Sequence, residues 1–180
     1  MTRPSLEDVL ALAGDAEAAS SCPGSPDHGV AHWRGVAEQG IWLARTLGLG
    51  REIQLAAFVF GAVHDCRREN EGHDPEHGPR AAAWLLASGW IGRLGLDSLE
   101  EDIVRSLTLH DQGITCADGS PAVGIGWDAD RSLLSRVGVD PHPRFFSLAQ
   151  GVVFNALVGR ARWMILDPED WDVLARKALA

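Results

Sequence analysis

Apolar residues recur at intervals of three and four positions along most of the chain, a spacing typical of amphipathic helices. No stretch shows the sustained two-residue alternation of a half-buried strand. The pattern predicts helices over residues 5–19, 30–47, 51–65, 75–90, 97–110, 128–137, 144–163 and 168–179. We therefore expect an all-α fold in which residues 1–180 form one domain, a bundle of about six to eight helices.

Local signals refine several of these boundaries. Ser5, followed three residues later by Asp8, is a capping-box signal and predicts the start of the first helix. The segment 51–65 is apolar on nearly every side, as expected of a central, buried helix. The glycine-rich stretch 111–126 predicts an irregular loop, so that the next helix begins at about Asp128.

Composition narrows the classes of partner. The formal net charge is −9, and Lys177 is the one lysine among 16 basic residues. Because a nucleic-acid backbone requires clustered cations, we expect no nucleic-acid polymer as a partner. No apolar run approaches the roughly 18 residues of a membrane span, and the N-terminus does not resemble a secretory signal. The three widely spaced cysteines predict no disulfide framework, so we expect a cytoplasmic protein without a membrane partner.

Histidines and aspartates gather where the predicted helices begin and end around the buried helix. One histidine lies in the first turn of the second predicted helix and another in the last turn of the buried one. Two more begin the fourth helix and end the fifth. One aspartate follows the histidine of the buried helix, and another is expected in the first turn after the glycine-rich loop. The six residues are His32, His64, Asp65, His77, His110 and Asp130.

Four imidazoles and two carboxylates at one point form a donor set for two divalent cations. Imidazole suits Mn, Fe, Co, Ni and Zn, and carboxylates also accommodate Mg, so the donor set leaves the metal open. Asp65 is the natural bridge between two ions, because it has two oxygens and its neighbour His64 binds one of the ions. Two cations about 3.5–4 Å apart can activate water and clamp a phosphoryl group.

This ordered set resembles the HD-domain superfamily of metal-dependent phosphohydrolases. The resemblance rests on DHGVAHW (27–33), HDCRRENEGHDPEHGPRAA (64–82) and DADR (128–131), and it is closest to small stand-alone bacterial members. It covers about residues 27–140, and the predicted C-terminal helices of residues 144–180 lie outside it. Members of this branch often continue the last motif with Leu-Asp, where this chain has Ser132 and Leu133.

The resemblance implies a dinuclear centre, because members with only four of the ligands usually carry one metal and members with two further histidines usually carry two. The ligands implied for the first metal are His32, His64, Asp65 and Asp130. The ligands implied for the second metal are His77 and His110, with Asp65 shared.

Residues close to the His64-Asp65 doublet are candidates for catalysis and substrate contacts. Arg67 and Arg68 follow it, and a guanidinium can bind two phosphate oxygens at once. His73 lies in the polar loop that follows and is interpreted as solvated or substrate-facing rather than as a ligand. His73, Asp111 or a metal-bound water can protonate a leaving group. The expected catalytic residues are Asp65, Arg67, Arg68 and His73, with a nucleotide or small phosphorylated metabolite as substrate.

Four further residues carry weaker signals. His28 and His142 lie in predicted loops and are interpreted as caps or solvated side chains. Trp33 adjoins His32, and Trp127 directly precedes the DADR motif. Either tryptophan can stack on a flat substrate, although core packing is the commoner role of this residue.

Two other functions are compatible with the same residues. Some HD proteins with six such ligands use a di-iron centre to activate oxygen and cleave C–C or C–P bonds. A second alternative is a non-catalytic module that binds metal or nucleotide and acts in regulation. Retention of all six ligands favours an enzyme over such a module.

Overall fold

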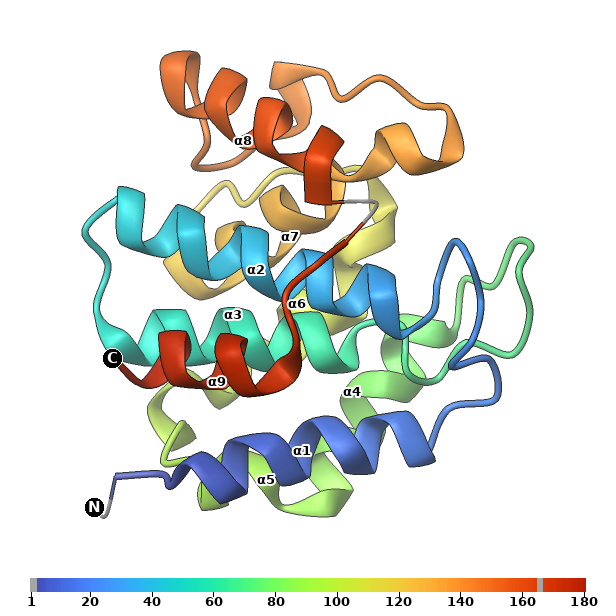
Figure 1. Cartoon of the computed structure of the whole chain (residues 1–180), viewed down its shortest axis with the longest axis vertical. Helices are drawn as coiled ribbons and strands as arrows, with labels where there is room; N and C mark the ends of the chain where they lie inside the picture. Colours follow the sequence, from blue (N-terminus) through green and yellow to red (C-terminus); the bar gives the residue numbers. More distant parts are fainter. Residues whose placement is uncertain (1–2, 165–166) are drawn as a thin grey trace.

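The computed structural model describes residues 3–164 and 167–180, and within these ranges it contains helices and no strand, which confirms the all-α class (Figure 1). The α-helices in the described residues are α1 (Leu6–Ala18), α2 (Val30–Thr46), α3 (Arg51–Val63), α4 (His77–Ser88), α5 (Trp90–Arg93), α6 (Glu100–Leu109), α7 (Pro121–Ser132), α8 (Gly151–Met164) and α9 (Trp171–Leu179). Short 3-10 helices in the same residues are η1 (Asp97–Leu99), η2 (His110–Gln112), η3 (Leu134–Val137) and η4 (Pro143–Phe145). Within the described ranges, none of these helices combines the length and the apolar character needed to cross a bilayer.

The first helix begins where the capping-box signal predicts. The Ser5 hydroxyl accepts a hydrogen bond from the Asp8 backbone N–H at 3.1 Å, and the Asp8 carboxylate accepts one from the Ser5 N–H at 3.2 Å. Two N–H groups that a helix start leaves without partners are thereby satisfied. The buried face of α1 is formed by Val9, Leu12 and Ala16.

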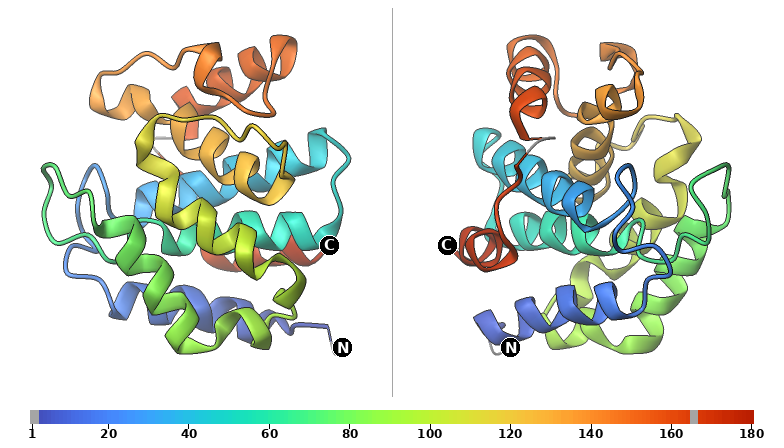
Figure 2. Two further views of the ribbon diagram at one scale, coloured as in Figure 1. Left: turned by 180° about the vertical axis from the view of Figure 1, so that it is seen from behind. Right: turned by 45° about the vertical axis from the view of Figure 1, so that its right-hand side comes forward.

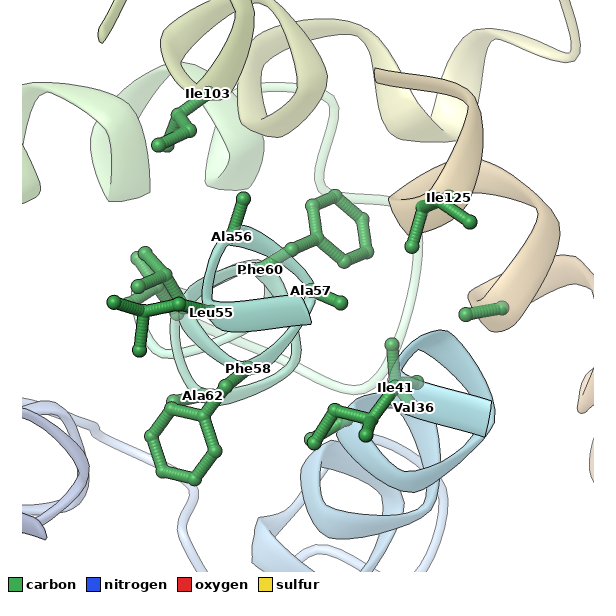
Figure 3. Packing of buried hydrophobic residues seen from close by; sticks show 14 of the residues in the cluster. Val36, Ile41, Leu55, Ala56, Ala57, Phe58, Phe60, Ala62, Ile103 and Ile125 are labelled. Atoms are coloured by element: carbon green, nitrogen blue, oxygen red, sulfur yellow. The ribbon is translucent and has the colours of Figure 1, made fainter. Parts of the chain in front are cut away.

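Helix α3 lies at the centre of the core, as its uniformly apolar sequence predicts. Figure 3 looks along this helix and shows Phe60 projecting toward Ile125 of α7. Phe58 projects from the opposite side, where its ring centroid lies 5.2 Å from that of Trp171 in α9. Both phenylalanines are fully buried. Burial of a side chain of this size stabilises the fold by roughly 1.5–3 kcal/mol, so α3 is a rigid base for the residues that follow it.

The predicted loop over 111–126 is partly wrong, because α7 already begins at Pro121. Ser120 caps this helix by accepting a hydrogen bond from a backbone N–H of the first turn. The glycines inside α7 are required for close packing rather than for a loop. A Cβ atom at Gly124 would lie 2.7 Å from the Leu148 side chain.

Gly126 has the same role on the side of α7 that faces α3. A Cβ atom there would lie 2.7 Å from the ring of Phe60. Because the helix begins seven residues earlier than predicted, Asp130 lies in its last turn and not in the first turn of a helix. The prediction that Asp130 lies at the start of a helix is therefore wrong, because it lies near the end of α7.

The helix predicted from residue 144 begins only at Gly151. The segment before it is held in a non-helical conformation by Asp128 of α7. The buried Asp128 carboxylate accepts hydrogen bonds from three successive backbone N–H groups at 2.7–2.8 Å, those of Ser147, Leu148 and Ala149. This contact fixes the segment between η4 and α8 against the end of α7.

Several helix ends meet on one side of the molecule. The loop before α2 and the loop after α3 lie side by side, at the right of Figure 1 and again together in both views of Figure 2. Ser25 of the first loop donates a hydrogen bond to Glu71 of the second at 2.6 Å. The first turn of α2, the end of α3 and the start of α4 are thereby brought to one place.

Candidate metal centre

The six predicted ligands come together at these helix ends. His32 lies in the first turn of α2, His64 directly follows α3, and His77 is the first residue of α4. His110 directly follows α6, and Asp130 lies in the last turn of α7.

The ligand atoms form two groups, and within each group they lie within 4.8 Å of one another. The first group is His32, His64 and Asp130, and the second is Asp65, His77 and His110. All of these side chains are buried except that of Asp130, which is partly buried.

Backbone carbonyls fix the orientation of three of the imidazoles. The Nδ1 atoms of His64, His77 and His110 each donate a hydrogen bond to a carbonyl oxygen three or four residues earlier in the chain. A carbonyl can only accept, so each neutral ring carries its proton on Nδ1 and a lone pair on Nε2. This arrangement is typical of metal-ligating histidines, whose second nitrogen is held by a neighbouring acceptor.

The Nε2 atoms face one another in pairs. His32 Nε2 lies 3.1 Å from His64 Nε2, and His77 Nε2 lies 2.8 Å from His110 Nε2. Two lone pairs at such a distance repel unless a proton or a cation lies between them. Two nitrogens that each lie about 2.0–2.1 Å from one cation are about 2.9–3.4 Å apart. The 3.1 Å spacing lies within this range and the 2.8 Å spacing lies just below it, so a cation between His77 and His110 requires their rings to separate slightly. The residues present therefore fit a pair of cations.

Asp65 lies between the two groups. Its Oδ1 atom is 3.2 Å from His77 Nε2, and its Oδ2 atom is 3.6 Å from His64 Nε2. One oxygen thus faces each group, which is the arrangement that a bridging carboxylate requires. Burial alone would raise the pKa of Asp65, but the surrounding imidazoles hold it well below its usual range, so this carboxylate is ionised.

The surroundings shift the pKa values of two buried imidazoles, His64 and His110, in opposite directions. Burial lowers the pKa of His64 to about 3, so its ring is neutral and can bind a cation. Burial opposes protonation of His110, but the nearby Asp65 and Asp130 carboxylates and the Leu107 carbonyl together outweigh burial and raise its pKa. A cation bound beside His110 would therefore replace a proton on its Nε2 atom.

Core side chains pack against the imidazole rings and restrict their movement. The Phe60 ring stacks on His64, with centroids 5.1 Å apart and an interplanar angle of 12°, and meets His110 edge-on at 5.9 Å. Gly78, next to His77, allows α4 to approach α6. A Cβ atom at Gly78 would lie 2.4 Å from the Leu107 carbonyl oxygen and 3.3 Å from the His110 ring.

A cavity of about 340 Å³ opens onto this centre. Four of the six ligands line it, namely Asp65, His77, His110 and Asp130. His32 and His64 are not among the lining residues and are closed off behind the others. A small ligand in the cavity can therefore reach both groups from the side of Asp65.

The two predicted arginines face different surroundings. Arg68 lines the cavity, and its Nε atom lies 3.7 Å from Asp65 Oδ1. Arg67 turns away and donates a hydrogen bond to the Ala19 carbonyl. The loop that carries both residues is braced by Arg80, whose guanidinium donates to the Arg67 carbonyl at 3.0–3.1 Å. Arg67 thus joins two loops, whereas Arg68 is presented to the cavity.

His73 and the two tryptophans lie away from the centre. His73 is exposed in the loop before α4 and is not among the residues that line the cavity. Trp33 and Trp127 are almost fully buried, with 0% and 2% of their surfaces exposed. Their suggested role in stacking on a substrate is therefore wrong, because core packing leaves neither ring a free face.

Several residues at the site carry no strong signal in the sequence. His28 Nδ1 lies 3.1 Å from Asp65 Oδ2, so this histidine contacts the carboxylate that lies between the two groups. Arg136 lines the cavity, with its Nη1 atom 3.9 Å from Asp130 Oδ1. His142 lines the cavity and also accepts a hydrogen bond from the Arg144 N–H, as expected of a cap. The proximity of His28 to His32 in the sequence was the one available hint.

Comparison of this chain with protein-family models, with curated proteins and with solved structures found no match. The geometry alone defines the class of site, which is a buried cluster of histidine and aspartate side chains that could hold metal ions.

Proposed function

We propose that this protein is a metal-dependent phosphohydrolase of the HD-domain type that acts on a small phosphate ester. The proposal rests on two pairs of histidines whose Nε2 atoms face each other, His32 with His64 and His77 with His110. The buried Asp65 carboxylate lies between the two pairs. Such a donor set suits two divalent cations held close together. The order of the ligands along the chain, which resembles the HD superfamily, supports the same function.

Each residue has a distinct role in this proposal. Asp65 would be shared by two cations, and the four histidines and Asp130 would complete their coordination. The bound cations would supply Lewis acidity for the activation of water and would offset charge on a phosphoryl group. Arg68 faces the same space and can donate two hydrogen bonds to phosphoryl oxygens, orienting phosphorus for in-line attack. His32 and His64 stay neutral ligands because burial lowers the pKa of each.

Turnover of phosphate esters by the metal-loaded protein tests this function. Protein stripped with a chelator and reloaded with Mn, Mg, Fe, Co, Ni or Zn is offered a panel of phosphomonoesters, and released phosphate is measured. We expect metal-dependent release that Asp65→Ala abolishes. Asp172→Ala, which removes an exposed aspartate of α9, is the matched control and retains activity.

The same preparation separates the two alternatives. Oxygen consumption with a di-iron EPR signal, and no phosphate release with any metal, would replace the hydrolase by an oxygenase. Tight nucleotide binding without turnover of either kind would favour a regulatory module.

A further inference from the structure

We propose that the cavity above the metal centre selects a phosphate monoester with a single anionic group and a small apolar organic group. This inference deepens the proposed function and rests on it. The cavity of about 340 Å³ has two chemically different parts. One part consists of the metal ligands and Arg68, and the other is a wall of apolar side chains from the segment that follows α7.

The polar part includes an arginine, Arg68, that lies beside Asp65 and keeps N–H groups without a hydrogen-bond acceptor in the part of the chain that the structure describes. The Arg68 side chain is 11% exposed, and its buried Nε and Nη1 atoms have no hydrogen-bond partner among the described residues. Leaving a buried guanidinium N–H without an acceptor is unfavourable, and phosphate oxygens match its geometry. Because Arg68 lines the cavity, these free donors mark the side of the cavity at which a phosphoryl group binds.

The other two arginines of the cavity are already engaged. Arg131 donates hydrogen bonds to two backbone carbonyl oxygens at 2.6 and 3.3 Å. Arg136 donates to a backbone carbonyl at 2.8 Å and lies beside Asp130. Asp111 and Asp140 are exposed lining residues and repel further negative charge. The cavity therefore accommodates one anionic group and disfavours nucleoside diphosphates and triphosphates.

Much of the remaining lining is apolar. Segment 134–146, coloured orange at the upper right of Figure 1, contributes five apolar side chains, those of Leu134, Val137, Val139, Phe145 and Phe146, beside the polar Arg136, Asp140 and His142. Val137 and Val139 are 41% and 50% exposed, so a ligand can still cover them. These five side chains contain no hydrogen-bonding atom, so a sugar hydroxyl placed against them would lose its water without a replacement. An alkyl or aryl group gains by covering the same surface.

Binding of two phosphonates of equal length and charge tests this inference without relying on turnover. Butylphosphonate and 3-hydroxypropylphosphonate differ only in a terminal methyl or hydroxyl group. Each is titrated into Mn-loaded protein by calorimetry. We expect butylphosphonate to bind at least tenfold more tightly, since one buried methylene alone is equivalent to about fourfold in affinity and the hydroxyl also loses its hydration.

Two sets of variants test which residues are responsible. One set tests whether the apolar side chains cause the preference for butylphosphonate, and the other tests whether Arg68 binds the phosphonate group of both ligands. The double variant Val137→Asn and Val139→Asn should reduce the ratio of the two affinities to about one to threefold. Val152→Asn, which changes an exposed valine of α8, is the matched control and should leave the ratio unchanged. Arg68→Gln should weaken both ligands by a similar factor and keep their ratio.

The possible outcomes separate this inference from the hydrolase proposal. Equal affinities, tighter binding of the hydroxyl compound, binding of neither phosphonate, or a ratio unaffected by the double valine variant would overturn the inference. Preferential hydrolysis of polar phosphate esters would overturn it while leaving the hydrolase function intact. Tighter binding of butylphosphonate without hydrolysis of butyl phosphate would support the ligand class and contradict the hydrolase function.

Discussion

At the scale of single residues, the main feature is the control of imidazole orientation by the backbone. His64, His77 and His110 each bind a carbonyl through Nδ1, which leaves Nε2 directed into the centre. The buried Asp65 faces both groups with one oxygen each. The site is therefore pre-organised for cations by contacts that exist without them. Because this carboxylate faces both groups, its loss would affect a cation at either of them.

Replacing Asp65 should remove both metals. Asp65→Ala takes away the shared ligand and leaves too little negative charge to offset two divalent cations among neutral imidazoles. We expect metal content, measured by mass spectrometry after gel filtration, to fall from two equivalents per chain to fewer than about half an equivalent. His73→Ala, which changes an exposed histidine, should retain both. Two full equivalents on Asp65→Ala would refute the bridging role.

At the scale of elements, the site depends on the relative positions of five helix ends, those of α2, α3, α4, α6 and α7. The small residue Gly78 sets the approach of α4 to α6, and α3 forms the support through Phe60. Ligands from five elements are held in register by this packing. A change that moves one helix end should therefore disturb the site without touching a ligand.

A methyl group at Gly78 should destabilise the protein and loosen the centre. Its Cβ atom would meet a backbone oxygen at 2.4 Å, and such overpacking typically costs about 1–3 kcal/mol. We expect Gly78→Ala to lower the free energy of unfolding in urea and to weaken metal binding. Gly159→Ala in α8 is the matched control, because nothing lies within 4 Å of its added Cβ. It should be neutral or slightly stabilising, by up to about 1 kcal/mol. Equal effects of the two substitutions would contradict the packing role of Gly78.

Sequence periodicity identified most of the elements but misplaced some boundaries. The capping box at Ser5 and the apolar run of α3 are local signals, and both are confirmed. The start of α7 was missed because Gly124 and Gly126 are usual in loops, and only their close neighbours in space explain them. The start of α8 was placed too early because the hydrogen bonds to Asp128 are long-range contacts.

At the candidate site, too, features that are local in the sequence could be predicted, whereas those that depend on long-range contacts could not. The order and helix-end positions of the six ligands were readable along the chain, and the structure brings them together. The roles of Arg67 and Arg68 could not be separated by sequence, since both follow the doublet and only the loop conformation turns one inward. The contact of His28 with Asp65 likewise depends on how two loops pack.

At the scale of the whole molecule, a cluster of buried titratable groups lies at the edge of an apolar core. Burial lowers the pKa of His32 and of His64, while neighbouring groups hold the pKa of the Asp65 and Asp130 carboxyls below its usual range. Stability and metal binding are therefore linked to protonation. Without cations, the folded protein must resist protonation of histidines that the unfolded chain protonates freely.

The metal-free protein should lose stability as the pH falls below about 6.5, the ordinary pKa of histidine. The pKa of His64 is about 3 in the folded protein, and that of His32 is also lowered, so the unfolded chain binds more protons between these values. His64 alone would account for up to about 2 kcal/mol between pH 6.5 and 5. The raised pKa of His110 acts in the opposite direction and offsets part of this loss.

Thermal unfolding in the presence of a chelator checks this expectation. The Tm should fall between pH 7 and pH 5, and the fall should be smaller in His64→Gln. The exposed His142→Gln should leave the pH dependence unchanged. A Tm that rises on acidification would contradict the assignment of a buried, neutral His64.

The most direct test of the central claim is anomalous diffraction from a crystal of the Mn-loaded protein. We expect two anomalous peaks per chain. One should lie within ligand distance of His32, His64 and Asp130, the other within ligand distance of His77 and His110, with Asp65 between them. Absence of any peak among these side chains at saturating Mn would contradict the claim that they form a metal centre.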